Sequence, residues 1–142
     1  MPPDDLIIDI LRADEIAPAV ALWERCGLTR PWNDARADAR LALAGPASTI
    51  LAGRRADRLA ATAMVGADGH RAWVYYLGVD PEERGRGVGA AMMTAAEAWA
   101  WGRGMPKLQL MVRADNAQAE AFYRAIGYEL ETVTVWSRRF KD

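Results

Sequence analysis

Residues that build disulfides and metal sites are scarce in this chain. Its 142 residues include a single cysteine, Cys26, and a single histidine, His70. One cysteine has no partner for an internal disulfide, and a structural zinc site takes about four Cys or His ligands. We therefore expect no metal centre, and a chain that works in a reducing, cytoplasmic environment.

An excess of one charge and a long apolar run are also missing. Lys and Arg number 18 and Asp and Glu 19, so the formal net charge is -1, which gives no general attraction to nucleic-acid phosphates or anionic lipid. No stretch approaches the roughly 20 apolar residues of a membrane span. The first residues are acidic where a secretory signal is basic. The sequence predicts neither nucleic acid nor a membrane as a partner.

The chain does have enough apolar material for one core. Hydrophobic residues make up 51% of it and charged residues 26%, and a chain of this length buries roughly 68–70% of its unfolded surface on folding. No repeat, linker or low-complexity tract divides it. We expect one domain over residues 1–142.

Short strands and helices follow one another along the chain. Apolar and alternating runs predict strands at 6–11, 48–53, 59–65, 72–79, 108–112 and, singly or as a pair, 128–140. Caps and helical spacing predict helices that begin near Asp14, Asp34, Val88 and Asp115. This order predicts a mixed α/β domain with one sheet. Residues 72–79 are apolar throughout, which is typical of a strand covered on both faces.

A glycine loop, Arg84-Gly-Arg-Gly-Val-Gly89, joins the buried strand 72–79 to the next helix. Its glycines leave backbone N–H groups uncovered, and a helix N-terminus adds free amides and a positive dipole end. Together with Arg84 and Arg86 these groups predict a pyrophosphate site. The alternative is a surface turn whose glycines serve only the backbone.

The same loop formally matches the dinucleotide fingerprint through Gly85, Gly87 and Ala90. In that fingerprint the first glycine follows its strand directly, and an acidic residue about 20 positions further on binds a ribose. Gly85 lies well beyond Val79, and no acidic residue follows at that distance. We interpret the match as accidental.

Two motifs, in this order, resemble the GNAT superfamily of N-acetyltransferases. Arg84-x-x-Gly87-x-Gly89 resembles its Gln/Arg-x-x-Gly-x-Gly/Ala motif, and Asn116-x-x-Ala-x-x-Phe-Tyr-x-x-x-Gly-Tyr128 is similar to its C-terminal segment. Segments 22–26, 30–34 and 68–71 are similar to the bacterial YpeA-type acetyltransferases, so the resemblance spans nearly the whole chain.

The resemblance implies a single GNAT-like α/β domain: a mixed central sheet, helices on both faces, and strands four and five splayed apart. It implies an enzyme that transfers the acetyl group of acetyl-CoA (coenzyme A) to a primary amine of a small molecule or peptide by direct attack. The acetyl-CoA contacts it implies are Leu77, Val79, Arg84, Gly85, Arg86, Gly87, Val88, Gly89, Ala90, Asn116, Phe122 and Tyr123.

Two of these positions are implied to be catalytic. The backbone amide of Leu77, freed by a bulge near Gly78, would stabilise the oxyanion, while Val79 would bond the pantetheine arm. Tyr123 would protonate the leaving thiolate, since a tyrosine is protonated at neutral pH. The alternatives are a packing gap at Gly78 and an aromatic core pair of Phe122 with Tyr123.

The acceptor site is predicted between a loop and a turn, which contribute Arg30, Trp32, Asn33, His70 and Arg71. The two arginines suit a carboxylate beside the acceptor amine; the alternative is a Trp32 that plugs the core edge and solvated arginines. Met111 stands where relatives that resemble ribosomal-protein N-terminal acetyltransferases carry a Glu, which disfavours a protein N-terminus. The general base is left open among Asp34, Glu24 and His70.

Two other functions stay open at this point. A catalytically silent acetyl-CoA-binding sensor would need the loop but neither an acid nor an acceptor pocket. A plain nucleotide-binding domain rests on the glycine loop alone. A homodimer is compatible with each of the three functions.

Overall fold

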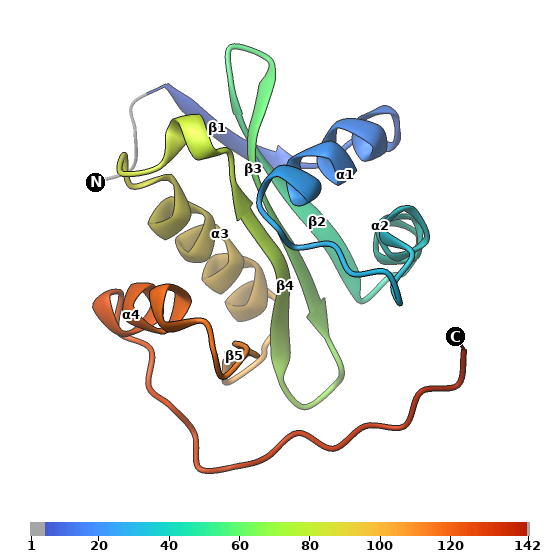
Figure 1. The fold of residues 1–142 in the computed structure, drawn as a ribbon, viewed down its shortest axis with the longest axis vertical. Coiled ribbons are helices and arrows are strands. Elements are labelled where there is room, and N and C mark those ends of the chain that lie inside the picture. Colours follow the sequence, from blue (N-terminus) through green and yellow to red (C-terminus); the bar gives the residue numbers. More distant parts are fainter. Residues whose placement is uncertain (1–4, 142) are drawn as a thin grey trace. The chain divides into compact units, whose positions relative to one another are not determined.

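The structure, a computed structural model, describes residues 5–141. It divides into two units, Met1–Leu110 and Met111–Asp142. The first holds the sheet and most of the helices (Figure 1). Its elements in chain order are β1 (Leu6–Ile10), the 3-10 turn η1 (Ala13–Glu15), α1 (Ile16–Arg25), α2 (Ala35–Ala44), β2 (Ser48–Arg55), β3 (Arg58–Ala67), β4 (Ala72–Val79), the 3-10 turn η2 (Pro81–Glu83), α3 (Val88–Gly102) and β5 (Leu108–Leu110).

Among the described residues the sheet has five strands, in the order β1-β2-β3-β4-β5. The first three pairings are antiparallel and β4 pairs with β5 in parallel, which confirms the predicted mixed sheet. Parallel pairing requires a crossover, and here α3 forms it. The first helix begins later than predicted, because the turn η1 precedes it and Glu15 accepts from the backbone N–H of Arg12 at 2.9 Å.

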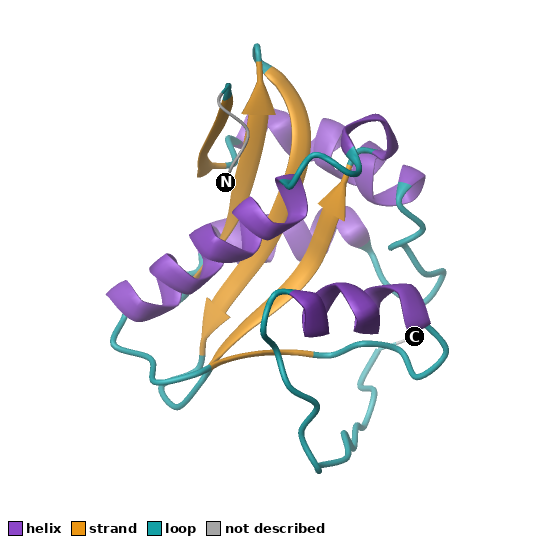
Figure 2. Cartoon of the chain, turned by 90° about the vertical axis from the view of Figure 1, so that its left-hand side faces the viewer, coloured by secondary structure: helices purple, strands orange, loops and turns teal. Residues whose placement is uncertain are grey.

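Helices cover both faces of this sheet, as predicted (Figure 2). Thr62 and Gly53 lie on opposite faces, since Gly53 pairs with Ala61, the neighbour of Thr62. Thr62 accepts a hydrogen bond from Trp23 of α1. On the other face, a side chain at Gly53 would meet Met92 of α3 at 2.9 Å.

The helix α3 buries a stripe of small and medium residues. Val88 and Met92 are buried as predicted, but Ala96 and Ala100 continue the stripe in place of Ala95 and Trp99. Alanines on that face let the helix lie close to the sheet. At 15 residues α3 is the longest helix of the chain's described part, where none is long and apolar enough to cross a membrane.

Strands β4 and β5 are paired over a short distance. Their register joins Ala72–Val74 to Leu108–Leu110, and β4 then continues to Val79. The predicted splay of strands four and five therefore begins after Val74. The prediction that both faces of β4 are covered is wrong at Tyr75, which is 43% exposed and stacks on Trp73.

In the second unit, the described residues 111–141 form one helix, α4 (Ala117–Ala125). Its N-cap is Asn116, whose side-chain oxygen accepts from Ala119 N at 3.0 Å, so the predicted cap at Asp115 is wrong by one residue. The predicted strands over 128–140 are also wrong, because residues 129–141 form no strand in the structure. Alternation makes a strand only where a neighbour pairs with it and one face is buried, and Val133 and Val135 are both largely exposed.

Candidate active site

The glycine loop adopts a backbone that requires two of its three glycines. Gly85 and Gly87 have φ values of +79° and +78°, in the left-handed region that other residues rarely adopt. Gly89 lies inside the first turn of α3 and has no such φ. Its lack of a side chain instead leaves the start of the helix uncovered.

The start of α3 presents three free backbone donors. Ala91 N donates to Gly87 O at 3.1 Å, and the N–H groups of Val88, Gly89 and Ala90 come before any acceptor within the helix. The N-cap is a glycine without a capping side chain. Arg84 and Arg86 lie exposed just before it and form no ion pair within residues 5–141. This arrangement fits a pyrophosphate.

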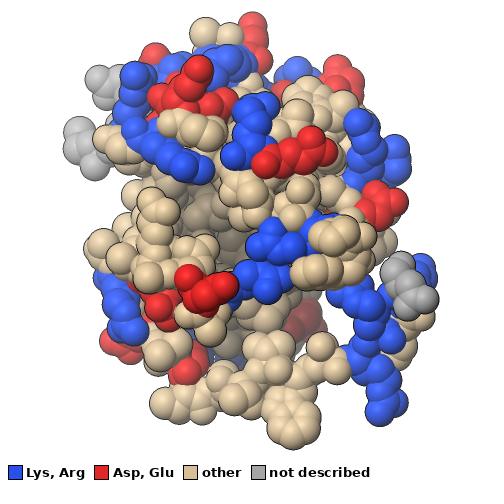
Figure 3. Space-filling model, viewed as in Figure 1, with Lys and Arg blue, Asp and Glu red and all other residues tan. Residues whose placement is uncertain are grey.

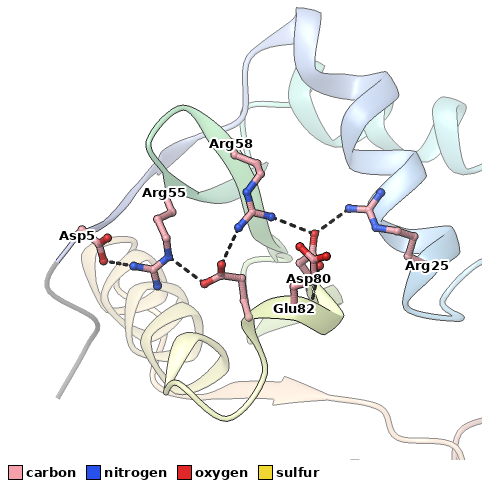
Figure 4. Close-up of polar contacts among 7 residues, drawn as sticks. Asp5, Arg25, Arg55, Arg58, Asp80 and Glu82 are labelled. Carbon is pink, nitrogen blue, oxygen red and sulfur yellow. Dashed lines mark hydrogen bonds and ion pairs between the residues drawn. The ribbon is translucent and has the colours of Figure 1, made fainter.

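Two buried carboxylates anchor the segment just before the loop (Figure 4). Asp80 is 7% exposed and Glu83 3% exposed. Glu83 accepts from Arg55 at 2.9 Å and from Arg58 at 2.6 Å. Asp80 accepts from Arg25 at 3.1 Å and from Arg58 at 3.4 Å. We call these five residues the charged cluster; it ties η2 to α1 and to the β2–β3 hairpin, where basic and acidic side chains lie next to one another (Figure 3).

Hydrogen bonds keep both carboxylates ionised. The backbone N–H of Glu82 donates to Asp80 at 3.0 Å, and this bond, followed by the contact with Arg25, lowers the pKa of Asp80. Burial alone would raise the pKa of Glu83, but the bonds from Arg55 and Arg58 outweigh it and the pKa is lowered. The signal in the sequence was a pair of acids after a buried strand and arginines on both sides of a turn; sequence reasoning did not connect them.

Strand β4 contains a bulge at Tyr76 and Leu77. Tyr75 faces Met64 and Gly78 faces Thr62, so Ala63 alone lies opposite two residues. The bulge was predicted near Gly78, and it lies just before that glycine. Tyr76 has a φ of +50°, which for a bulky residue costs roughly 1–3 kcal/mol unless the surroundings enforce it.

The residues around Tyr76 stabilise this left-handed backbone conformation. Its ring stacks on Trp23 with centroids 4.0 Å apart, and its hydroxyl donates to Asp38 of α2 at 2.8 Å. Thr62 accepts from Trp23 Nε1 at 2.8 Å and donates to the carbonyl of Tyr76 at 2.9 Å. We call these four residues the aromatic cluster. Burial first, and then the hydrogen bond to Asp38, raises the pKa of Tyr76 well above its usual range.

Gly78 serves packing instead of the bulge. A Cβ at this position would lie 3.3 Å from Leu28, 3.5 Å from the sulfur of Cys26 and 3.6 Å from Trp23. The glycine therefore lets the C-terminal end of α1 approach β4. Packing thus accounts for the glycine at this position, while the predicted bulge is present at the two residues before it.

The predicted acceptor residues lie on two separate segments. Arg30 donates through Nη1 to the carbonyls of Gly27 and Thr29, both at 2.8 Å. Arg71 donates to the carbonyl of His70 at 3.0 Å, and the turn at 68–71 closes the far end of the β3–β4 hairpin. Each guanidinium thus binds backbone of its own segment. Trp32 is 46% exposed and Asn33 is exposed.

The second unit carries the predicted acid in an aromatic group. Tyr123 lies edge-on to Phe122 with centroids 5.0 Å apart, and edge-on to Tyr128 at 5.8 Å. Burial raises the pKa of Tyr123 to about 12, so its hydroxyl carries a proton throughout the neutral range. The oxygen of Asn116 is used in the helix cap.

Comparison with known sequences gives one consistent result. The model of the acetyltransferase (GNAT) family matches residues 17–128. The chain is 40% identical over 124 residues to an acetyltransferase of Sodalis glossinidius, with 87% of each protein covered. It is 38% identical over 136 residues to an acetyltransferase of Pectobacterium atrosepticum, with 95% of this chain and 96% of the relative covered.

Solved structures share the fold. An aminoglycoside N-acetyltransferase, AAC(6')-Iy in complex with CoA, is similar with a TM-score of 0.81 at 16% identity, covering 95% of both chains. A ribosomal-protein alanine N-acetyltransferase from Escherichia coli is similar with a TM-score of 0.72 at 23% identity, covering 89% of this chain and 79% of that one. With the family match and both relatives in agreement, the chain belongs to the acetyltransferase (GNAT) family and is an acetyl-CoA-dependent N-acetyltransferase.

Proposed function

We propose that this enzyme acetylates a primary amine of a small molecule or peptide by direct attack of the amine, without an acetylated enzyme intermediate. The observation that carries the proposal is the joining of two features on one segment. An anion cradle at the start of α3 directly follows β4 and η2, and β4 runs beyond its pairing with β5 and contains a bulge. A phosphate group and an extended pantetheine arm need these two features side by side.

Each part of this segment has its own proposed role in binding acetyl-CoA or in acetyl transfer. Arg84, Gly85, Arg86 and Gly87, with the free amides of Val88, Gly89 and Ala90, would hold the pyrophosphate. The backbone of Val79 would bind the pantetheine arm along the open part of β4. The N–H of Leu77, released from the ladder by the bulge, would donate to the carbonyl oxygen as it gains negative charge.

Tyr123 is the proposed general acid. In the transfer a carbon–nitrogen bond forms, the carbon–sulfur bond breaks, the amine gives its proton to water or a base, and the thiolate takes one from Tyr123. A pKa of about 12 supports a protonated hydroxyl at neutral pH. Asn116 and Phe122 are further proposed contacts of acetyl-CoA. The family match over residues 17–128 draws on both units, which supports one functional domain.

The acceptor is proposed to carry a carboxylate beside its amine. Both hydrogen bonds of Arg30 use Nη1, so the other edge of the guanidinium can still form a fork with a carboxylate. Trp32, Asn33, His70 and Arg71 would complete the pocket. Two similar folds act on an aminoglycoside and on a ribosomal protein, so the acceptor has to be identified directly. We place the reaction in the cytoplasm, which fits the lone thiol of Cys26.

Turnover of acetyl-CoA against a panel of amines tests the function. Release of free CoA thiol with amino-acid-like or peptide amines is the expected result, and Tyr123→Phe should lower kcat by about 10²–10⁴-fold with unchanged acetyl-CoA affinity. Tight binding of acetyl-CoA without turnover of any amine would favour a sensor. Binding of NAD in preference to CoA would contradict the site. A polyamine as best acceptor would contradict the carboxylate pocket alone.

A further inference from the structure

We propose that Tyr76 and Asp38 are positioning residues for acetyl transfer. Their side-chain hydrogen bond holds the β4 bulge in the conformation that keeps the N–H of Leu77 out of the ladder. This inference rests on the proposed function, because it gives the bulge its role at the acyl group. Neither residue belongs to the predicted set of site residues.

The left-handed backbone conformation of Tyr76 has to be stabilised by contacts of its side chain. A φ of +50° lies in the left-handed region, which glycine adopts readily and which is unfavourable for tyrosine. If the side chain is released, the residue regains its preference for negative φ. The strand can then straighten, and Leu77 can return toward a place opposite β3. A tyrosine in this position is therefore stable only while its side chain is held.

The side chain is held at both ends. Its ring lies against Trp23 at 4.0 Å with planes 18° apart, and its hydroxyl reaches Asp38 at 2.8 Å. Ring stacking limits the plane of the side chain but leaves it free to slide. The bond to Asp38 removes that freedom, because it fixes the far end of the ring to α2.

The bond has a fixed direction at neutral pH. Burial and Asp38 keep the proton on Tyr76, and the charge of Asp34 acts in the same sense. Asp38 is itself set in the first turn of α2, where its N–H donates to Asp34 O at 2.9 Å. The helix that borders the proposed acceptor loop is thereby connected to the bulge. The Tyr76–Asp38 pair thus links the acceptor side of the site to the group that stabilises the acyl oxygen.

Three variants and one matched control test the proposal. Tyr76→Phe removes the hydroxyl but keeps the ring, Asp38→Ala removes the acceptor, and the third variant combines them. Tyr75→Phe, on the neighbouring and exposed tyrosine, is the control. Each purified protein is assayed for kcat, for KM of the best amine, for acetyl-CoA affinity by calorimetry, and for exchange of the Leu77 amide by NMR.

We expect kcat to fall by about tenfold or more in both single variants, less than the about 10²–10³-fold that follows loss of an oxyanion donor outright. Acetyl-CoA affinity should stay constant, and the double variant should fall no further than the worse single one, since both remove one bond. Asp38→Asn keeps an acceptor oxygen and should retain most of the activity. The Leu77 amide should become protected in both single variants and not in Tyr75→Phe.

Unchanged kcat in both single variants, or losses that multiply in the double variant, would overturn the proposal while the enzyme itself stays active. Loss of affinity in parallel with kcat would assign the pair to the fold as a whole and would also overturn it. If the wild-type protein turns over no amine, the proposed function fails by itself. The exchange of Leu77 then still decides whether the pair controls the bulge.

Discussion

The charged cluster and the aromatic cluster hold neighbouring parts of the same strand by different means. In the charged cluster, buried Asp80 and Glu83 bind three arginines just after β4 ends. In the aromatic cluster, one ring stack and three hydrogen bonds enclose Tyr76 inside β4. The charged cluster depends on ionised side chains, and the aromatic cluster depends on a tyrosine that keeps its proton.

The difference has a consequence for how each cluster fails. A buried ion pair that loses one partner leaves the other as an uncompensated charge, which destabilises strongly. The two hydrogen bonds of Thr62 in the aromatic cluster join uncharged groups, so loss of one partner leaves an unpaired donor or acceptor but no unpaired charge, which destabilises less. The loop that follows the charged cluster should therefore be the more sensitive of the two regions to single substitutions.

Removal of Glu83 should have the largest effect. Glu83→Ala removes the buried carboxylate that Arg55 and Arg58 share, although Arg55 keeps Asp5 and Arg58 keeps Asp80 as acidic partners. We therefore expect a loss at the low end of the range for a broken buried ion pair, about 3 kcal/mol in the free energy of unfolding. Acetyl-CoA affinity should fall with it, because η2 no longer orients the loop. Urea unfolding and calorimetry measure both, with the exposed neighbour Glu82→Ala as the control. Equal stability of Glu83→Ala and Glu82→Ala would show that the charged cluster does not stabilise the segment before the glycine loop.

Removal of the Thr62 hydroxyl should have an intermediate effect. Thr62→Val keeps the shape but leaves the indole N–H of Trp23 unpaired and takes a donor from the carbonyl of Tyr76. A buried unsatisfied donor costs about 1–3 kcal/mol. Thr94→Val, on the exposed side of α3, is the control. A Thr62→Val loss as large as that of Glu83→Ala would remove the distinction between the clusters.

The two clusters should also fail at opposite ends of the pH scale. The pKa values of Asp80 and Glu83 are lowered in the fold, so their contribution is present above about pH 4, where the unfolded groups ionise, and is lost as the pH falls through the folded values. Glu15, held by Arg54 with a pKa of about 2, adds to the same acid limb. The raised pKa of Tyr76 gives a contribution that is present below about pH 10 and is lost as the pH rises further.

Stability measured across pH tests this difference. Glu83→Gln should flatten the acid limb and leave the alkaline limb as it is. Tyr76→Phe should flatten the alkaline limb alone. The opposite pattern, or one limb that changes in both variants, would mean that other groups control the pH dependence.

Part of this arrangement could be predicted from sequence because local patterns encode it. The strand 72–79, the first three residues of the strand predicted at 108–112, the helix from Val88 and the backbone of the glycine loop follow from apolar runs and from residues that only a few backbones accept. The charged cluster joins residues far apart in the chain, such as Arg25 with Asp80, and no local pattern marks such a pair. The final strands were predicted from alternation alone, which says nothing about a partner to pair with.

The bulge in β4 also shows how far local sequence patterns can predict the structure of a strand. A glycine marked its neighbourhood, but Tyr76 takes the left-handed backbone and Gly78 gives room to Leu28 and Cys26. Propensity places the unusual φ on the glycine, and tertiary contacts override it. The motif therefore leads to the backbone amides of the candidate site, whose roles in binding and catalysis stay predictions, whereas no local pattern marks the side chains that contact Tyr76.

Gly89→Asp is the substitution with the smallest expected effect on stability. It tests whether the glycine loop can lose acetyl-CoA binding while the charged cluster still anchors it. Gly89 lies in the first turn of α3 with an ordinary helical backbone, so Gly89→Asp introduces no strain of the kind that Gly85 or Gly87 would suffer. A carboxylate at a helix N-terminus is favourable by about 0.3–1 kcal/mol, so the free protein should be slightly more stable. The same carboxylate lies where the pyrophosphate is proposed to bind, and repulsion should abolish acetyl-CoA binding in calorimetry.

Gly89→Ala adds a side chain without charge and is the matched control. Gain of stability with loss of binding would separate anchoring from binding, whereas retained affinity in Gly89→Asp would mean that the pyrophosphate binds elsewhere.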